Sequence, residues 1–274
     1  MLALRRDPPP MLTLLLTFLA LGALVGILAG LLGIGGGLVL VASLAWLLPQ
    51  HGIPREAAMH AALASSLGSI VLTSLSSTRA HHRRGSVLWP SVAWLVPGIM
   101  LGAWLGSRFA IGLDGAVLRW AFVAYCLLIA AQMAFSGTPA AGAGVAPPRG
   151  PRMSLAGGGI GAVSAVVGIG GGSLTVPLLT WLGVAPVRAV GTAAACGIFI
   201  GLASAAGYAL QAPAGALPGY SIGYVYLPAA IGVALASILT APLGARIAHA
   251  ISGVALKRVF AVFMLLVGLG MAAW

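Results

Sequence analysis

The chain has 274 residues, of which 60% are hydrophobic and only 6% are charged. A soluble domain carries about a quarter charged residues, so this composition excludes a water-soluble protein and indicates an integral membrane protein. At about 20 residues per span, the length leaves room for roughly eight spans. The net charge of +11 does not indicate nucleic-acid binding. Most basic residues stand singly at the ends of apolar blocks, where they set membrane topology.

Apolar blocks follow one another along the chain in two sets. The first set covers residues 11–48, 57–77, 86–108 and 117–135, and the second covers 153–182, 189–210, 224–246 and 254–274. The segment between the sets is rich in Gly, Ala and Pro, which is typical of a linker. We therefore expect an all-α membrane fold with a first membrane repeat at 11–135, a linker at 136–152 and a second membrane repeat at 153–274.

The two sets are an internal duplication. The run Gly-Ile-Gly-Gly-Gly occurs at residues 33–37 and again at 168–172. Near the far end of each set, Leu-Gly-Ser-Arg at 105–108 matches Leu-Gly-Ala-Arg at 243–246. A membrane chain with a helix-breaking motif at corresponding places in two halves has the layout of a secondary transporter, whose binding site lies between the repeats.

The first block of each repeat is predicted to be broken at its Gly-Ile-Gly-Gly-Gly run, because each Gly costs a helix about 1 kcal/mol relative to Ala. Two topologies remain open. If this block crosses the membrane once, the halves are parallel and several basic residues face outward, against the positive-inside tendency. If it returns to its starting side, the halves are inverted and most basic residues are cytoplasmic. The inverted repeat is favoured.

Acidic residues are nearly absent: the chain has only Asp7, Glu56 and Asp114. Acid–base catalysis needs carboxylates placed together in one site, and no such pair is expected inside the membrane. There is also no metalloprotease, serine-hydrolase or P-loop motif. Cys126 and Cys196 lie singly in apolar runs without metal-ligand spacing. We therefore expect no enzyme, no metal and no cofactor, and the scarcity of acids indicates an anionic ligand.

The two glycine runs form the candidate anion site. Glycine lets main-chain N–H groups turn toward a ligand, and the N-terminus of a broken helix carries a positive dipole end. Small hydroxyl side chains can donate further hydrogen bonds. The predicted substrate-binding residues are Gly35, Gly36, Gly37, Ser65, Ser66, Gly170, Gly171, Gly172, Ser173, Thr175 and Thr192.

The second run is the more polar of the two, because Ser173 and Thr175 follow it where Leu38 and Leu40 follow the first. We expect the second run to make more side-chain contacts with the anion. Close packing of helices is the alternative role for glycine, and bonding to the own helix is the alternative for the hydroxyls. The glycines that fit a packing pattern are Gly22, Gly26, Gly30, Gly98, Gly102 and Gly106.

A few titratable residues remain. Glu56 and His60 are the candidates for proton coupling, and an interfacial histidine without that role is the alternative for His60. The cluster His81, His82, Arg83 and Arg84 predicts a solvated cytoplasmic loop, with an anion-gathering funnel as its functional interpretation. Arg108 and Arg246 are equivalent in the repeat and predict helix-end anchors, or alternatively a symmetric pair of anion contacts.

At these residues the chain resembles the TauE/SafE family of sulfite and organosulfonate exporters, also called the toluene sulfonate uptake permease family. The resemblance rests on both Gly-Ile-Gly-Gly-Gly runs, on Ser-Leu-Ser-Ser at 74–77, on Ala-His-His-Arg-Arg-Gly at 80–85 and on Ala-Val-Gly-Thr at 189–192. The chain departs from the family pattern at Ala42, which stands where a proline matching Pro177 is expected.

The resemblance implies a multi-pass carrier of the bacterial inner membrane that exports sulfite or an organosulfonate such as sulfoacetate. The alternatives are an anion channel and an uptake carrier for thiosulfate or small carboxylates. The expected partners are the small anion and the lipid bilayer, and a homo-oligomer is compatible with the sequence.

Overall fold

The computed structural model describes residues 11–32, 36–135, 146–250 and 253–273. The first half contains α1 (Met11–Leu32), α2 (Gly37–Leu47), the 3-10 helix η1 (Leu48–His51), α3 (Arg55–His82), α4 (Trp89–Ile111) and α5 (Gly115–Phe135). The second half contains α6 (Pro151–Val167), α7 (Gly172–Trp181), α8 (Pro186–Leu210), β1 (Ser221–Ile222), β2 (Val225–Tyr226), α9 (Leu227–Ala250) and α10 (Gly253–Ala272).

The predicted all-α membrane fold is confirmed. Within the described ranges, five helices are long and apolar enough to cross a membrane, and they fall in α3, α4, α5, α8 and α9. The predicted block 11–48 is divided into α1 and α2. Helix α6 begins at Pro151, which places the last two residues of the predicted linker in the helix. Proline suits the first turn of a helix, where its missing N–H has no helical acceptor.

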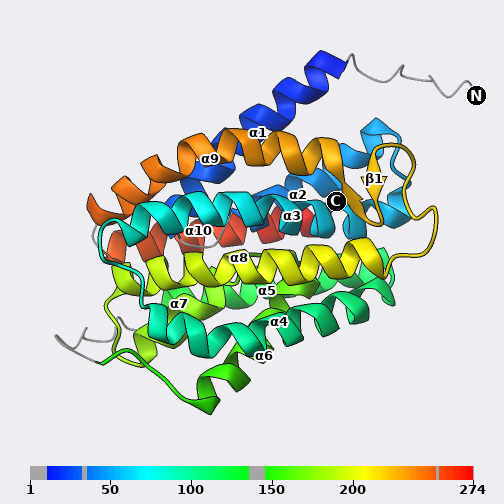
Figure 1. Ribbon diagram of the computed structural model, residues 1–274. Helices are drawn as coiled ribbons and strands as arrows, with labels where there is room; N and C mark the ends of the chain where they lie inside the picture. Colours follow the sequence, from blue (N-terminus) through cyan, green and yellow to red (C-terminus); the bar gives the residue numbers. More distant parts are fainter. Residues whose placement is uncertain (1–10, 33–35, 136–145, 251–252, 274) are drawn as a thin grey trace, which may run out of the picture.

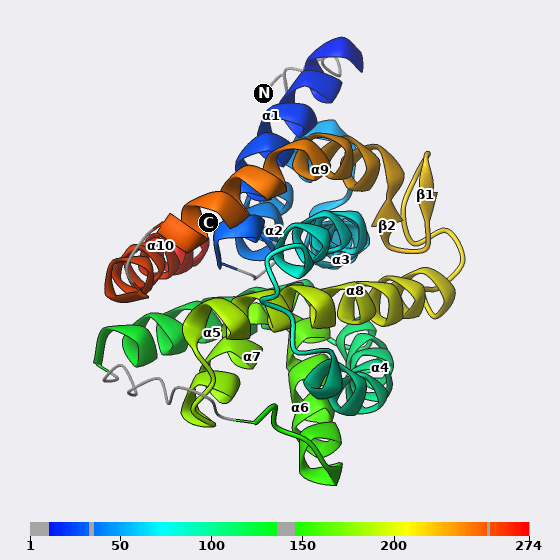
Figure 2. The ribbon, with the colours of Figure 1, turned by 60° about the vertical axis from the view of Figure 1, so that its left-hand side comes forward.

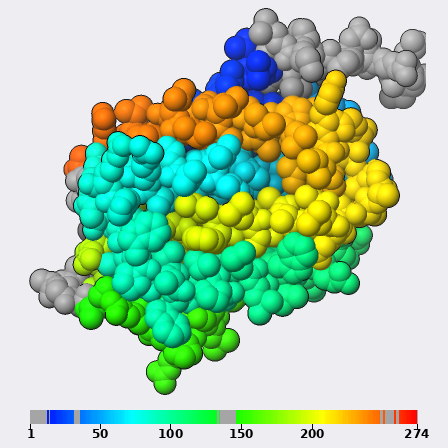
Figure 3. Space-filling view, viewed as in Figure 1, coloured from blue at the N-terminus to red at the C-terminus, as the bar shows by residue number. Residues whose placement is uncertain are grey.

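The helices pack in pairs that join the two halves of the chain. Helix α1 lies along α9, α4 lies along α6, and α5 packs against α10 (Figures 1 and 2). Helices α3 and α8 occupy the centre, with α1 and α9 on one side and α4 and α6 on the other (Figure 2). Figure 3 shows α9, α3, α8 and α4 side by side across one face. Each pair contains one helix from each half.

Glycine seams bring two of these pairs into backbone contact. A Cβ at Gly26 would lie 2.6 Å from the carbonyl oxygen of Ser237 in α9, and one at Gly102 would lie 2.0 Å from that of Gly158 in α6. Any larger side chain would push the helices apart, so these positions need small residues. Contacts of the same kind follow at the other predicted packing glycines, which are Gly22, Gly30, Gly98 and Gly106.

The central helices α3 and α8 run in opposite directions. Gly191, near the start of α8, packs against Ser86 just beyond the end of α3, while Gly201 packs against Leu67 nearer the α3 start. The molecule therefore has two ends. The basic end holds the α3–α4 loop and the start of α8. The mouth end holds the start of α3, the α4–α5 loop and the β1–β2 hairpin.

Candidate functional site

Both glycine runs interrupt a helix. Gly36 has φ 65° and directly precedes α2. In the second run, Gly168 has φ 75° at the end of α6, and Gly171 has φ 71° directly before α7. This left-handed backbone favours glycine, which explains the residue type at these positions. Gly35, which belongs to the predicted site, lies outside the described residues.

The two interruptions lie against each other in the centre of the molecule. A Cβ at Gly37 would lie 2.7 Å from the carbonyl oxygen of Gly168 and 3.1 Å from the Cα of Ile169. The hydroxyl of Ser66 in α3 donates to the Gly168 carbonyl at 2.9 Å and is 3.4 Å from that of Gly37. One serine thus joins segments that lie more than a hundred residues apart in the chain.

Helix α2 begins at this junction, and α7 begins at Gly172, four residues after Gly168. In α2, the backbone N–H of Leu40 donates to the carbonyl oxygen of Gly36. In α7, the N–H groups of Leu174 and Thr175 donate to the carbonyl oxygen of Gly171. The N–H groups that come before these donors have no acceptor within the helix. They also carry the positive end of each helix dipole. The junction can therefore offer backbone donors from both halves to an anion.

Side-chain hydroxyls are concentrated at the second interruption. Ser173 is fully buried and its hydroxyl bonds the phenol of Tyr125 in α5. Thr175 is also fully buried, and in the described structure its hydroxyl has no hydrogen-bond partner. The same holds for the hydroxyl of Ser164 in α6, which lies 3.2 Å from where a Gly171 Cβ would be. A buried hydroxyl without a partner is costly, which is why such a group indicates a ligand or water.

Two of the predicted hydroxyls make other contacts. Ser65 faces the hairpin, where its hydroxyl accepts a hydrogen bond from the backbone N–H of Tyr226 at 2.9 Å. Thr192 lies toward the basic end, where its hydroxyl accepts from the N–H of Leu88 at 3.0 Å and donates to the carbonyl of Arg188 at 2.7 Å. The structure does not bring either hydroxyl to the glycine junction.

Glu56 and His60 line a polar cavity at the mouth end, of about 640 Å³. We call it the mouth cavity. The His60 ring stacks on Tyr224 of the hairpin, with ring centres 4.8 Å apart, and its Nε2 lies 3.3 Å from the carbonyl oxygen of Ala110. The other charged residues that line this cavity are Arg55, Asp114 and Arg119. Burial raises the pKa of the Tyr224 phenol, which stays neutral at physiological pH.

The basic cluster at the opposite end is only partly the solvated loop that its composition predicts. His82, Arg83 and Arg84 are exposed, but His81 is fully buried with its Nε2 3.2 Å from the carbonyl oxygen of Gly30. The guanidinium of Arg84 donates to the carbonyl of Ala245 at 2.9 Å and so binds α9. The prediction is therefore wrong for His81, because that side chain is inserted between α3 and α1.

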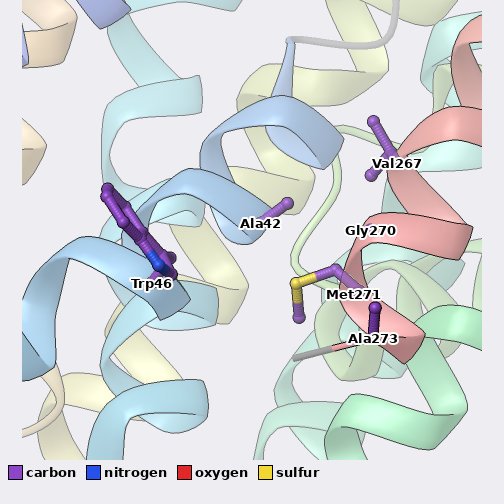
Figure 4. A pocket seen from close by; sticks show the side chains of 6 residues that line it. All are labelled: Ala42, Trp46, Val267, Gly270, Met271 and Ala273. Atoms are coloured by element: carbon purple, nitrogen blue, oxygen red, sulfur yellow. The ribbon is translucent and has the colours of Figure 1, made fainter.

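A second cavity, of about 370 Å³, lies between α2 and α10 (Figure 4). Ala42 and Trp46 line it from α2, and Val267, Gly270 and Met271 line it from α10. These side chains are almost wholly apolar, so the cavity cannot compensate the loss of an anion's hydration. It is a poor candidate for the anion site.

The model of the family described as "Sulfite exporter TauE/SafE" matches residues 18–271. The chain belongs to this family. A "probable membrane transporter protein" of Haemophilus influenzae is 36% identical over 263 residues, which cover 95% of this chain and 99% of that protein. One of Methanocaldococcus jannaschii is 27% identical over 242 residues, covering 88% of this chain and 89% of the relative. No solved structure matches the chain. The protein is thus a multi-pass membrane transporter of the TauE/SafE type.

Several site residues of this TauE/SafE transporter escaped the sequence prediction. Ser164 and Tyr125 reach the second interruption, and Asp114, Arg119 and Tyr224 join Glu56 and His60 in the mouth cavity. Ser164 lies four residues before Gly168, so its place on the last turn of α6 was readable from the sequence. The other four come from α5, the loop before it and the β1–β2 hairpin, and their assembly depends on tertiary packing. Arg108 and Arg246 are exposed, as expected of helix-end anchors.

Proposed function

We propose that the protein exports a small sulfur-containing anion, either sulfite or an organosulfonate such as sulfoacetate, across the bacterial inner membrane. The observation that carries the proposal is the meeting of the two glycine interruptions at Ser66, with α2 beginning at this junction and α7 beginning four residues after Gly168. Family membership supports the substrate class.

The anion would lie at the junction and accept hydrogen bonds from N–H groups of the first turns of α2 and α7, near Gly37 and Gly172. The unpartnered hydroxyls of Thr175 and Ser164 add donors on the side of the second half. An oxyanion accepts hydrogen bonds at every oxygen, so a site made of N–H and O–H donors suits it without any cationic side chain.

The two halves would be related as inverted repeats. The equivalent central helices α3 and α8 run in opposite directions, which supports inversion over a parallel duplication. The basic end carries most of the arginines, whereas Arg55, Arg108 and Arg119 lie toward the mouth end. By the positive-inside rule the basic end is then cytoplasmic and the mouth cavity faces outward. The interior-negative potential would drive anions toward the mouth.

Reconstitution into liposomes tests this function. Vesicles containing the protein are loaded with sulfite, thiosulfate, sulfoacetate or taurine, and counterflow of labelled anion is measured for each. We expect saturable exchange of sulfite or sulfoacetate, faster than in empty vesicles. Absence of exchange for all four compounds contradicts the proposal. Currents far above carrier turnover would instead identify an anion channel.

A further inference from the structure

His60 has the features of a residue that binds a ligand in the mouth cavity. Its side chain is 5% exposed, and within the described structure its Nδ1 has no hydrogen-bond partner. The Nε2 faces the carbonyl oxygen of Ala110, so Nε2 carries the hydrogen in the neutral ring and Nδ1 presents a lone pair. Once protonated, Nδ1 becomes a donor that can bind an oxyanion.

The charges around His60 are balanced. Arg55 and Glu56 of α3 line the mouth cavity together with Asp114 of the α4–α5 loop and Arg119 of α5. The Tyr224 phenol, from the hairpin, adds no charge at neutral pH. Two cations therefore face two anions, and protonation of His60 decides whether the cavity is neutral or positive.

The hairpin holds this arrangement in place. The backbone N–H of Tyr224 donates to the carbonyl of Tyr208 in α8 at 3.2 Å, and that of Tyr226 donates to Ser65 in α3. Gly223 has φ 57°, and its Cβ would lie 2.5 Å from the carbonyl of Ala209, so the turn fits closely onto α8. The ring that stacks on His60 is thereby attached to both central helices.

We propose that the mouth cavity is a second binding site for a small oxyanion, and that His60 takes up one proton as the anion binds. The proposal deepens the proposed function and rests on it, since the exported anion is the ligand that reaches the mouth. No bond is made or broken other than proton binding to Nδ1. The affinity of the cavity for the anion is high at low pH and falls as rising pH removes the proton from His60. By linkage, the bound anion raises the proton affinity of His60 by the same factor.

The test uses the purified full-length chain in detergent, titrated calorimetrically with sulfoacetate, whose charge is constant between about pH 6 and about pH 8. Titration in buffers of different ionisation heat gives the affinity and the number of protons taken up. The variant is His60→Gln, since the Gln amide can still donate to Ala110 but does not titrate. The matched control is His51→Asn, because His51 lies outside the mouth cavity and its Nδ1 contacts the carbonyl of Leu47.

We expect the wild-type chain and His51→Asn to bind roughly tenfold more tightly at about pH 6 than at about pH 8, with proton uptake. His60→Gln should show less than about a twofold change and no uptake. The proposal is overturned if His60→Gln takes up as many protons on binding as the wild-type chain, or if binding by the wild-type chain does not depend on pH.

Glu56→Gln keeps the proposal testable if His60→Gln does not fold. Removing an acid makes the cavity more positive, so affinity at about pH 8 should rise several-fold while the pH dependence remains. Unchanged affinity overturns the assignment of the anion to this cavity. If no anion is exchanged in liposomes but anion binding still takes up a proton, the proposed export function is contradicted and this inference is not. If anions are exchanged but their binding does not depend on pH, this inference is contradicted and the export function is not.

Discussion

The two glycine interruptions have similar backbones but different surroundings. At the first, Gly36 is followed by Leu38 and Leu40, which are buried in the apolar core. At the second, the hydroxyls of Ser164, Ser173 and Thr175 surround the start of α7, and two of these three have no hydrogen-bond partner in the described structure. The two helix starts are similar in backbone conformation, but only the second has polar side chains around it. The second interruption is therefore the candidate for substrate contact, and the first for a supporting wall.

The largest expected effect is on the free energy of unfolding, which a substitution at the first interruption should lower more than one at the second. A Cβ at Gly36 would lie 2.5 Å from the Val25 carbonyl oxygen, whereas one at Gly171 would lie 2.3 Å from the movable Cδ1 of Ile200. Both positions have positive φ, which costs a non-glycine residue about 1–2 kcal/mol. We expect Gly36→Ala to destabilise by about 3 kcal/mol or more and Gly171→Ala by less.

Gly85→Ala is the matched control for that pair. Gly85 has φ 67°, but no atom lies within 4 Å of its Cβ position, so only the backbone strain of about 1–2 kcal/mol applies. Thermal unfolding of the three variants in detergent measures the order. If Gly36→Ala and Gly85→Ala lose the same amount of stability, then Gly36 does not pack as closely as described.

A smaller effect concerns the link between the interruptions. Ser66→Ala removes the donor to the Gly168 carbonyl and should destabilise by about 1–3 kcal/mol, because it leaves a buried acceptor without this bond. Ser69→Ala is the control, since Ser69 donates only within its own helix, to the carbonyl of Ser66, and should cost less than about 1 kcal/mol. Similar unfolding temperatures for the two variants would mean that Ser66 does not hold the interruptions together.

The smallest effect concerns the contact that the second interruption makes with α5. Tyr125→Phe removes the hydrogen bond to Ser173 and should cost about 1 kcal/mol of unfolding free energy. Tyr220→Phe serves as control, because Tyr220 is 70% exposed and should be neutral. An unchanged melting temperature for Tyr125→Phe would remove one of the features that distinguish the second interruption.

The sequence predicted the features that depend on local composition. Clustered glycines broke the first block of each half where expected, and apolar runs predicted the long helices. Which way a helix residue faces could not be predicted: Ser65 and Ser66 are neighbours, yet Ser65 contacts the hairpin and Ser66 the glycine junction. The hairpin strands have two residues each, too short for an alternating pattern. The charged neighbours of His81 predict an exposed side chain, but tertiary packing buries it.

The central claim, that the anion binds chiefly at the second interruption, is tested most directly by the anion affinity of Thr175→Val. Valine keeps the shape of threonine and removes only the unpartnered hydroxyl, so the fold should be retained. A hydrogen bond to a charged ligand is worth about 1.5–3 kcal/mol, which corresponds to a loss of about ten- to a hundredfold in sulfite or sulfoacetate affinity. Thr180→Val, on the same helix, removes a hydroxyl that bonds only its own helix and should bind normally. Wild-type affinity in Thr175→Val would contradict the claim.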